Sequence, residues 1–145
     1  IVVAGHASAV RRAMAVAKSR GAKRAVELAV SAPFHCALMS PAAEGLARVL
    51  IAIPVSPLVV PVIANVTAEV NRDPLRVKDL LVQQVTAPVR WEESMAKLKS
   101  LGCEVAIAVG PGKVLAGLLK RIVSDLPCVS VSDPATLADV PEVLA

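Results

Sequence analysis

Aromatic residues are nearly absent from this chain of 145 residues, which has one phenylalanine, one tryptophan and no tyrosine. Its hydrophobic content is nevertheless 55%, so a buried core has to be built from valine, leucine, isoleucine and alanine. That composition is typical of parallel strands buried on both faces of a sheet. The sequence therefore predicts a globular α/β protein.

Charged residues are also scarce, at 19%, and the formal net charge of +4 is unevenly spread. Six of the 16 basic residues fall within one stretch of fourteen residues, at Arg11, Arg12, Lys18, Arg20, Lys23 and Arg24. Because no aromatic side chains stand between them as stacking platforms, a nucleic-acid partner is disfavoured. A solvated face or a docking surface for an acidic protein is favoured instead.

Cysteine is limited to Cys36, Cys103 and Cys128, which lie far apart and form no CxxC pair. Neither a disulfide framework nor a metal site is predicted, and a reducing compartment such as the cytoplasm fits best. Residues 49–68 carry no charge over a membrane's span, but three prolines within them would break a lone helix. No membrane segment or signal peptide is expected, although a chain beginning at Ile1 leaves open what precedes it.

Hydrophobic spacing predicts alternating strands and helices. Apolar runs at residues 1–4 and 25–30 indicate strands, which flank a helix with Val10, Met14 and Ala17 on one face. Residues 1–30 are therefore expected to form a β-α-β unit.

Capping residues mark the later elements. Ser40 is expected to cap a helix with Pro41 at its first position, and Asp73 with Pro74 repeats this pattern. Gly102 closes another helix. The remaining predicted elements are strands at 59–66, 105–109 and 129–131, a helix at 114–126 and a terminal helix after Asp133.

The helix that follows Asp73 has a polar residue in its apolar stripe. Val77, Leu80, Leu81 and Gln84 fall on one face, and Pro88 ends the helix. A buried amide needs hydrogen-bond partners. Spacing alone leaves open whether Gln84 has such a role or merely ends a frayed helix.

His35 follows a proline-stiffened turn and lies next to Phe34, the only phenylalanine. A histidine beside an apolar face is either structural or catalytic, and the pattern does not decide between them. Cys36 does not form a Cys-His pair with it, because neighbouring side chains project apart. Cys36 is better explained as a small buried residue.

Two glycine turns resemble functional loops, but neither has the residue pattern of a catalytic or phosphate-binding site. Gly5 to Ala9 lacks the GxSxG pattern of a nucleophile elbow, so Ser8 is not expected to be a nucleophile. The turn from Gly110 to Lys113 lacks the spacing of a phosphate loop. A tight strand-to-helix turn is favoured there over a flavodoxin-like nucleotide site.

Four blocks in this order resemble the C-terminal half of the malonyl-CoA:acyl carrier protein transacylases. They are SAPFHCALMSPA at 31–42, ANVTA at 64–68, QVTAPVRW at 84–91 and GPGKVLAGL at 110–118. The resemblance implies that residues 1–30 are the second half of a ferredoxin-like small subdomain. Residues 31–145 would be the C-terminal part of a hydrolase-like parallel-sheet core.

The same resemblance implies a Ser-His ping-pong reaction in fatty acid or polyketide synthesis. A serine takes malonyl from malonyl-CoA and passes it to the pantetheine thiol of acyl carrier protein, with no metal or cofactor beyond the coenzyme A thioester. His35 would be the base, held by the main-chain carbonyl of Gln84, and Phe34 would accompany malonyl preference. The resemblance also suggests that Arg11, Arg12 and Lys18 dock the acidic carrier.

One departure from the family limits this expectation. No GHSLGE-like nucleophile elbow is present, so the chain alone is expected to be inactive and poorly soluble, and the complete enzyme to be a monomer. The alternative is a non-catalytic fragment that docks the carrier protein or serves a structural role.

Overall fold

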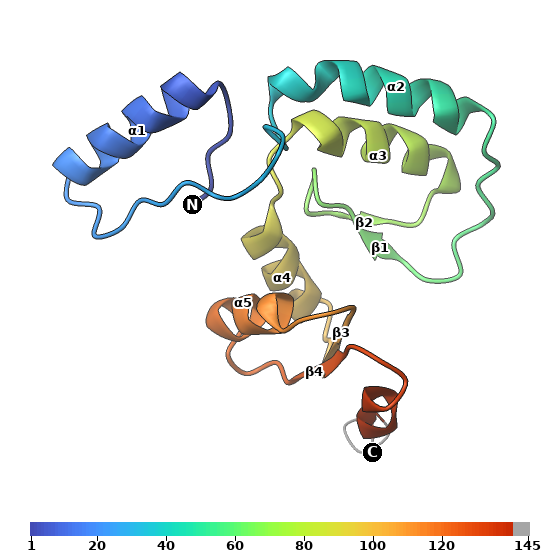
Figure 1. Ribbon diagram of the computed structural model, residues 1–145. Helices are drawn as coiled ribbons and strands as arrows, with labels where there is room; N and C mark the ends of the chain where they lie inside the picture. Colours follow the sequence, from blue (N-terminus) through green and yellow to red (C-terminus); the bar gives the residue numbers. More distant parts are fainter. Residues whose placement is uncertain (141–145) are drawn as a thin grey trace. The chain divides into compact units, whose positions relative to one another are not determined.

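The computed structural model describes residues 1–140, which form parts of two compact units (Figure 1). Unit 1 comprises Ile1–Val62 and Asn71–Val89, and unit 2 comprises Ile63–Val70 and the chain from Arg90 onward. The helices of unit 1 are α1 (Ala7–Ser19), α2 (Ser40–Ile51) and α3 (Val77–Thr86). Unit 2 contains α4 (Trp91–Ser100), β3 (Ala106–Val109), α5 (Val114–Ile122) and β4 (Cys128–Val131). The family-based division at residue 30 stays a prediction.

The segments on either side of α1 do not form the strands that the sequence predicts. Residues 1–4 and 25–30 were predicted as strands, but the structure assigns no strand to either segment. An apolar run favours extended backbone, whereas a strand also needs a partner backbone, and residues 1–140 provide none beside these segments. The helix itself forms, with Val10 and Met14 half-buried on the predicted face.

Helices α2 and α3 pack side by side in unit 1 (Figure 1). The predicted cap at Asp73 is confirmed, because its Oδ1 accepts the Leu75 N–H at 2.9 Å, and it caps a 3-10 helix at Pro74–Arg76 that leads into α3. Ser40, however, is the first residue of α2 rather than its cap. A one-turn helix at Ala37–Met39 precedes α2, and the Ser40 hydroxyl donates back to the Ala37 carbonyl at 2.7 Å.

The strand predicted at 59–66 is reduced to β1 (Val62–Ile63), which pairs with β2 (Val70–Asn71). The chain reverses directly after β1, where the Ala68 N–H donates to the Ala64 carbonyl at 2.8 Å. Ala68 takes the left-handed φ of 55° in this turn. The tight reversal explains why the strand is short.

Unit 2 has a small core beside a parallel pair of strands. Strands β3 and β4 run parallel, with Ala106 opposite Cys128 and Val109 opposite Val131, so the predicted α/β class is confirmed. The core consists of Leu119, Val123 and Leu126, against which Met95, Leu98, Ala106, Ile122 and Cys128 pack. Helix α5 ends at Ile122 rather than at residue 126, because Val123 leaves the helical conformation with ψ 80°.

Apolar side chains remain exposed on β3, where Ile107 is 42% and Val109 is 79% accessible. The terminal helix predicted after Asp133 begins as a 3-10 helix at Thr136–Asp139, and residues 141–145 lie outside the described residues. No helix within residues 1–140 is long and apolar enough to cross a membrane.

Candidate functional site

The backbone around His35 is tightly folded. The Phe34 N–H donates to the Ala32 carbonyl at 3.0 Å, and the Met39 N–H donates to the Cys36 carbonyl at 3.0 Å. Between these turns His35 adopts a φ of 60°, in the left-handed region that costs a non-glycine residue about 1–2 kcal/mol. Such strain persists where surrounding contacts fix the conformation, and it is common at functional sites.

The His35 ring contacts the main chain of α3. Its Nδ1 lies 3.0 Å from the carbonyl oxygen of Gln84, 49 residues further along the chain. Because a carbonyl oxygen only accepts hydrogen bonds, Nδ1 must carry the proton and donate it. A neutral ring then has its lone pair on Nε2, the nitrogen that can accept a proton from a nucleophile. The contact is present, and the role as base stays a prediction.

Burial on α3 follows the predicted stripe in part. Leu80 is buried and Gln84 is half-buried, whereas Gln83 is exposed. Leu81, expected on the same face, is 37% exposed. Gln84, which the hydrophobic spacing placed on the buried face, is therefore half-buried as expected. The group of Gln84 that contacts His35, however, is its main-chain carbonyl.

The two neighbours of His35 have different surroundings. The Cys36 thiol donates to the Pro33 carbonyl at 3.1 Å, so it is engaged within the turn. Phe34 is 48% exposed. Its contribution to acyl-group preference stays a prediction.

Arg90 joins two of the blocks that carry the family resemblance. Its backbone N–H donates to the Asn65 carbonyl at 3.0 Å, and its Nη1 donates to the Thr67 carbonyl at 2.7 Å. The hydrogen bond with Glu93 raises the pKa of Arg90 and lowers the pKa of the Glu93 carboxyl. Sequence reasoning assigned Arg90 no role, although an Arg and a Glu three residues apart on a helix indicate such a pair.

The Gly110 turn resembles a structural turn more than an anion site. Gly110 and Gly112 have φ of 131° and 93°, which favours glycine. The Gly110 N–H already donates to the Val131 carbonyl at 2.9 Å. A shallow hollow of about 350 Å³ beside the turn is lined by Val109, Gly110, Val131, Ser132, Asp133, Pro134 and Leu137. An acidic residue in this mostly apolar lining does not favour a phosphate.

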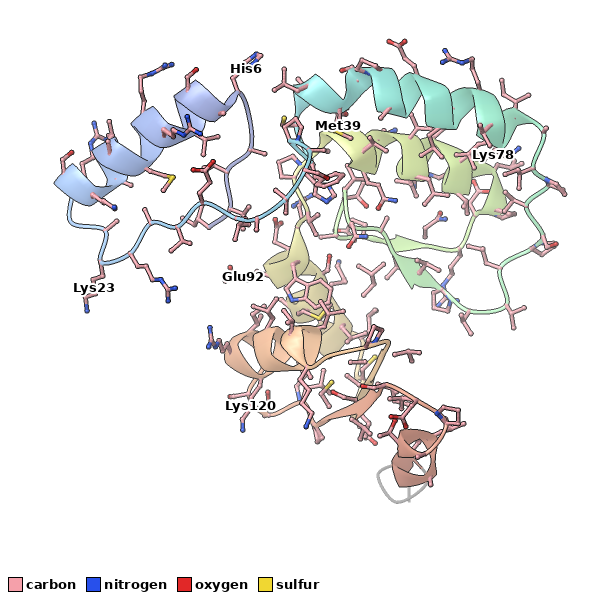
Figure 2. The ribbon with its side chains drawn as sticks, viewed as in Figure 1. His6, Lys23, Met39, Lys78, Glu92 and Lys120 are labelled. Carbon is pink, nitrogen blue, oxygen red and sulfur yellow. The ribbon has the colours of Figure 1, made fainter. Side chains whose placement is uncertain are left out.

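The basic stretch lies on and after α1. Arg11, Arg12 and Lys18 are exposed, and Arg11 forms an ion pair with Glu27 at 3.7 Å. Figure 2 labels His6 at the start of α1 and Lys23 after its end. Within residues 1–140, no three His, Cys, Asp or Glu residues are grouped to hold a metal ion.

No protein-family model matches the chain, but the curated proteins to which it is similar share one name. The malonyl CoA-acyl carrier protein transacylase of Haemophilus influenzae is 47% identical over 144 residues, which cover 99% of this chain and 46% of the relative. The enzyme of the same name from Escherichia coli K12 is 45% identical over 138 residues, or 95% of this chain and 45% of the relative. The chain thus spans about half the length of these curated relatives.

Solved structures give the same result. The acyl-carrier-protein S-malonyltransferase of Bartonella henselae superposes with a TM-score of 0.91 at 44% identity, covering 97% of this chain and 45% of that one. A malonyl-transacylase in complex with a type II polyketide-synthase acyl-carrier protein gives a TM-score of 0.90 at 43% identity, covering 95% and 45%.

Proposed function

Because the chain corresponds in sequence and fold to the C-terminal part of the malonyl-CoA:acyl carrier protein transacylase family, we propose that it supplies the general base for malonyl transfer. The donor is malonyl-CoA and the acceptor is the pantetheine thiol of acyl carrier protein. The observation that carries this proposal is the contact between His35 Nδ1 and the Gln84 carbonyl at 3.0 Å. It orients the ring and directs the lone pair to Nε2.

The reaction proceeds in two half-reactions on a serine outside this chain. As the serine oxygen attacks the thioester carbonyl, its proton moves to His35 Nε2, and the coenzyme A sulfur leaves with that proton. The carrier thiol then gives its proton to Nε2 as its sulfur attacks the malonyl-serine ester, and the serine oxygen leaves with that proton, which restores the neutral ring. Each half-reaction is an acyl transfer coupled to a proton transfer, and we propose that no bound metal or cofactor is required.

The Gln84 carbonyl stabilises the ring while it is protonated. An imidazolium donates from both nitrogens, and its hydrogen bond to a carbonyl becomes charge-assisted, with a contribution of roughly 1.5–3 kcal/mol. The helix that carries Gln84 thereby takes the place of a carboxylate partner. The contribution comes from main-chain atoms, so the Gln84 side chain is expected to tolerate exchange.

A hybrid enzyme tests this role. It joins the N-terminal part of the Escherichia coli relative to this chain, in place of the segment that aligns with it. His35→Ala should lower malonyl transfer by about 100-fold or more, because general base catalysis contributes about 10²–10⁴-fold. Gln84→Ala and the control His6→Ala should retain transfer within a few-fold. A His35→Ala hybrid with unchanged kcat would contradict the proposal, and the chain alone should not hydrolyse malonyl-CoA.

A carrier-docking role for α1 is the second part of the proposal. Arg11, Arg12 and Lys18 are exposed cations on this helix, and opposite charge mainly accelerates encounter with an acidic partner. Reversing the three charges in the hybrid should raise the KM for acyl carrier protein and leave the KM for malonyl-CoA unchanged. Lys120→Glu, on α5, is the matched control. In the alternative, a purely docking fragment, the hybrid would bind carrier but transfer nothing.

Phe34 is proposed to favour malonyl over methylmalonyl thioesters, in line with its place beside His35. The test is Phe34→Ser in the hybrid, with kcat/KM measured for both thioesters. If the ratio of kcat/KM for the two thioesters is unchanged, Phe34 does not determine acyl-group preference.

A further inference from the structure

The carbonyl that receives His35 lies at a particular step of the α3 hydrogen-bond ladder. In an α-helix the carbonyl of residue i accepts the N–H of residue i+4. The Gln83 carbonyl follows this rule and accepts the Ala87 N–H at 3.2 Å. For Gln84 the residue at i+4 is Pro88, which has no N–H to donate. Pro88 therefore cannot form the α-helical hydrogen bond to the Gln84 carbonyl, which is the carbonyl that His35 contacts.

Pro88 also sets the direction of the chain after α3. The residue before a proline is disfavoured in the helical region and shifted toward extended backbone. Ala87 has φ −101° and ψ 151°, as this restriction requires. The backbone thus leaves the helix axis at Ala87, one residue before Pro88.

The end of α3 has a second property that suits a histidine. Its last turn contains no basic residue, although the partial negative charge of a helix C-terminus favours a cation there. His35, brought from outside the helix, supplies the ring that becomes cationic when it accepts a proton. One helix end therefore offers both the hydrogen-bond acceptor and the favourable field.

We propose that Pro88 is a positioning residue for His35: because it has no N–H, no helical donor at i+4 competes with His35 Nδ1–H for the Gln84 carbonyl. It fixes the ring tautomer without contacting a substrate. The proposal rests on the role proposed for His35, but its first test measures the tautomer directly and needs no activity.

The first test is the variant Pro88→Ala in the full chain, with both histidines labelled with ¹⁵N. In the parent chain the His35 nitrogen shifts should identify a proton on Nδ1. In Pro88→Ala the new N–H can extend α3 and bond the Gln84 carbonyl, so the proton should move toward Nε2, as in free histidine. His6 serves as the internal reference and should not change. Unchanged His35 shifts would overturn the proposal.

An ester variant separates the N–H from the proline ring. With lactic acid in place of Pro88, the chain is flexible at this position but still has no N–H to donate. His35 should then keep the parent tautomer. If the ester variant behaves like Pro88→Ala, the ring of Pro88 and not its missing donor is responsible, and the proposal fails. Pro88 is exposed, so neither variant removes buried contacts.

Activity in the hybrid enzyme gives an independent readout. Pro88→Ala should lower kcat by about tenfold, as expected when part of the general-base contribution is lost, with the KM for malonyl-CoA unchanged. A raised KM with unchanged kcat would contradict a positioning role. If the tautomer shifts in Pro88→Ala while His35→Ala keeps full activity, the proposed function fails but this inference stands.

Discussion

Helices α3 and α4 are both ten residues long, yet their C-termini are completed in different ways. At the end of α4 the chain closes on itself: the Leu101 N–H donates to Lys97 and the Gly102 N–H donates to Lys99, at 3.1 and 3.0 Å. At the end of α3 the Gln84 carbonyl takes its donor from His35, 49 residues earlier. The α4 end is closed by backbone N–H groups that follow it directly, whereas the α3 end, which is followed by Pro88, also binds a side chain from a distant part of the chain.

The C-terminal turns of α3 and α4 also differ in the basic residues that they contain. The last turn of α4 contains Lys97 and Lys99, which reach Glu69 and Asp125, both at 2.8 Å. The last turn of α3 contains no basic residue. One helix therefore carries its own cations and the other receives an imidazole. The candidate site lies at the end that local sequence leaves incomplete.

The largest effect is expected where α4 packs on the core of unit 2. Leu119, 3% exposed, lies in the cluster against which Met95 and Leu98 of α4 pack. Leu119→Ala should lower the free energy of unfolding of unit 2 by about 3 kcal/mol, as for other buried leucines. Urea titration followed by the fluorescence of Trp91, the only tryptophan, measures this change.

The two helix ends should respond differently to that substitution. The His35 nitrogen shifts should stay unchanged in Leu119→Ala, because the contact with Gln84 is made within unit 1. Leu115→Ala, on the same helix but 49% exposed, is the control and should cost about 0.5 kcal/mol or less. A change in the His35 shifts would show that the two helix ends are coupled and do not respond independently.

The sequence predicted where α3 and α4 end, but not which groups complete these ends. Pro88 and Gly102 end their helices as predicted, and Asp73 caps as predicted, since each depends on the chemistry of adjacent backbone. The parallel strands β3 and β4 followed from apolar runs. Local pattern succeeded at these positions, where the partner atoms are near in sequence, but failed at Ser40 and at the end of α5.

Features that need a distant partner could not be found in this way. The segments 1–4 and 25–30 are apolar, but being a strand depends on a neighbouring backbone that a local pattern does not contain. The left-handed φ of His35 has no signal, because the residue is not glycine. Spacing indicated only that Gln84 faces inward, and its contact with His35 was expected solely from the family resemblance.

A smaller effect is expected from the glycine that closes α4. Gly102 has φ 79°, and a Cβ there would meet no atom within 4 Å, so Gly102→Ala acts only through the backbone. It should lower the free energy of unfolding by about 1 kcal/mol. Gly117→Ala is the matched control, since Gly117 lies inside α5 with equally open surroundings and should gain about 0.5–1 kcal/mol. Equal losses in both variants would mean that Gly102 is not required by its φ.

The smallest effect concerns the cation that α4 carries at its end. The hydrogen bond from Lys99 lowers the pKa of the Asp125 carboxyl below 3.8, so the folded chain binds that proton less readily than the unfolded chain. The resulting stability is present above the unfolded pKa and is lost as pH falls through the folded one. Asp125→Asn should therefore lose less stability than the parent between about pH 5 and pH 3.

Urea titrations at the two pH values measure that difference, which should shrink at high salt because both side chains are exposed. Glu104→Gln, which removes another exposed carboxyl of unit 2, is the control and should follow the parent. If Asp125→Asn also follows the parent, Lys99 acts on the helix terminus alone. Lys99 and the His35 ring would then each interact favourably with the C-terminus of a helix. The two ends would differ only in that Lys99 belongs to α4 itself, whereas His35 comes from outside α3.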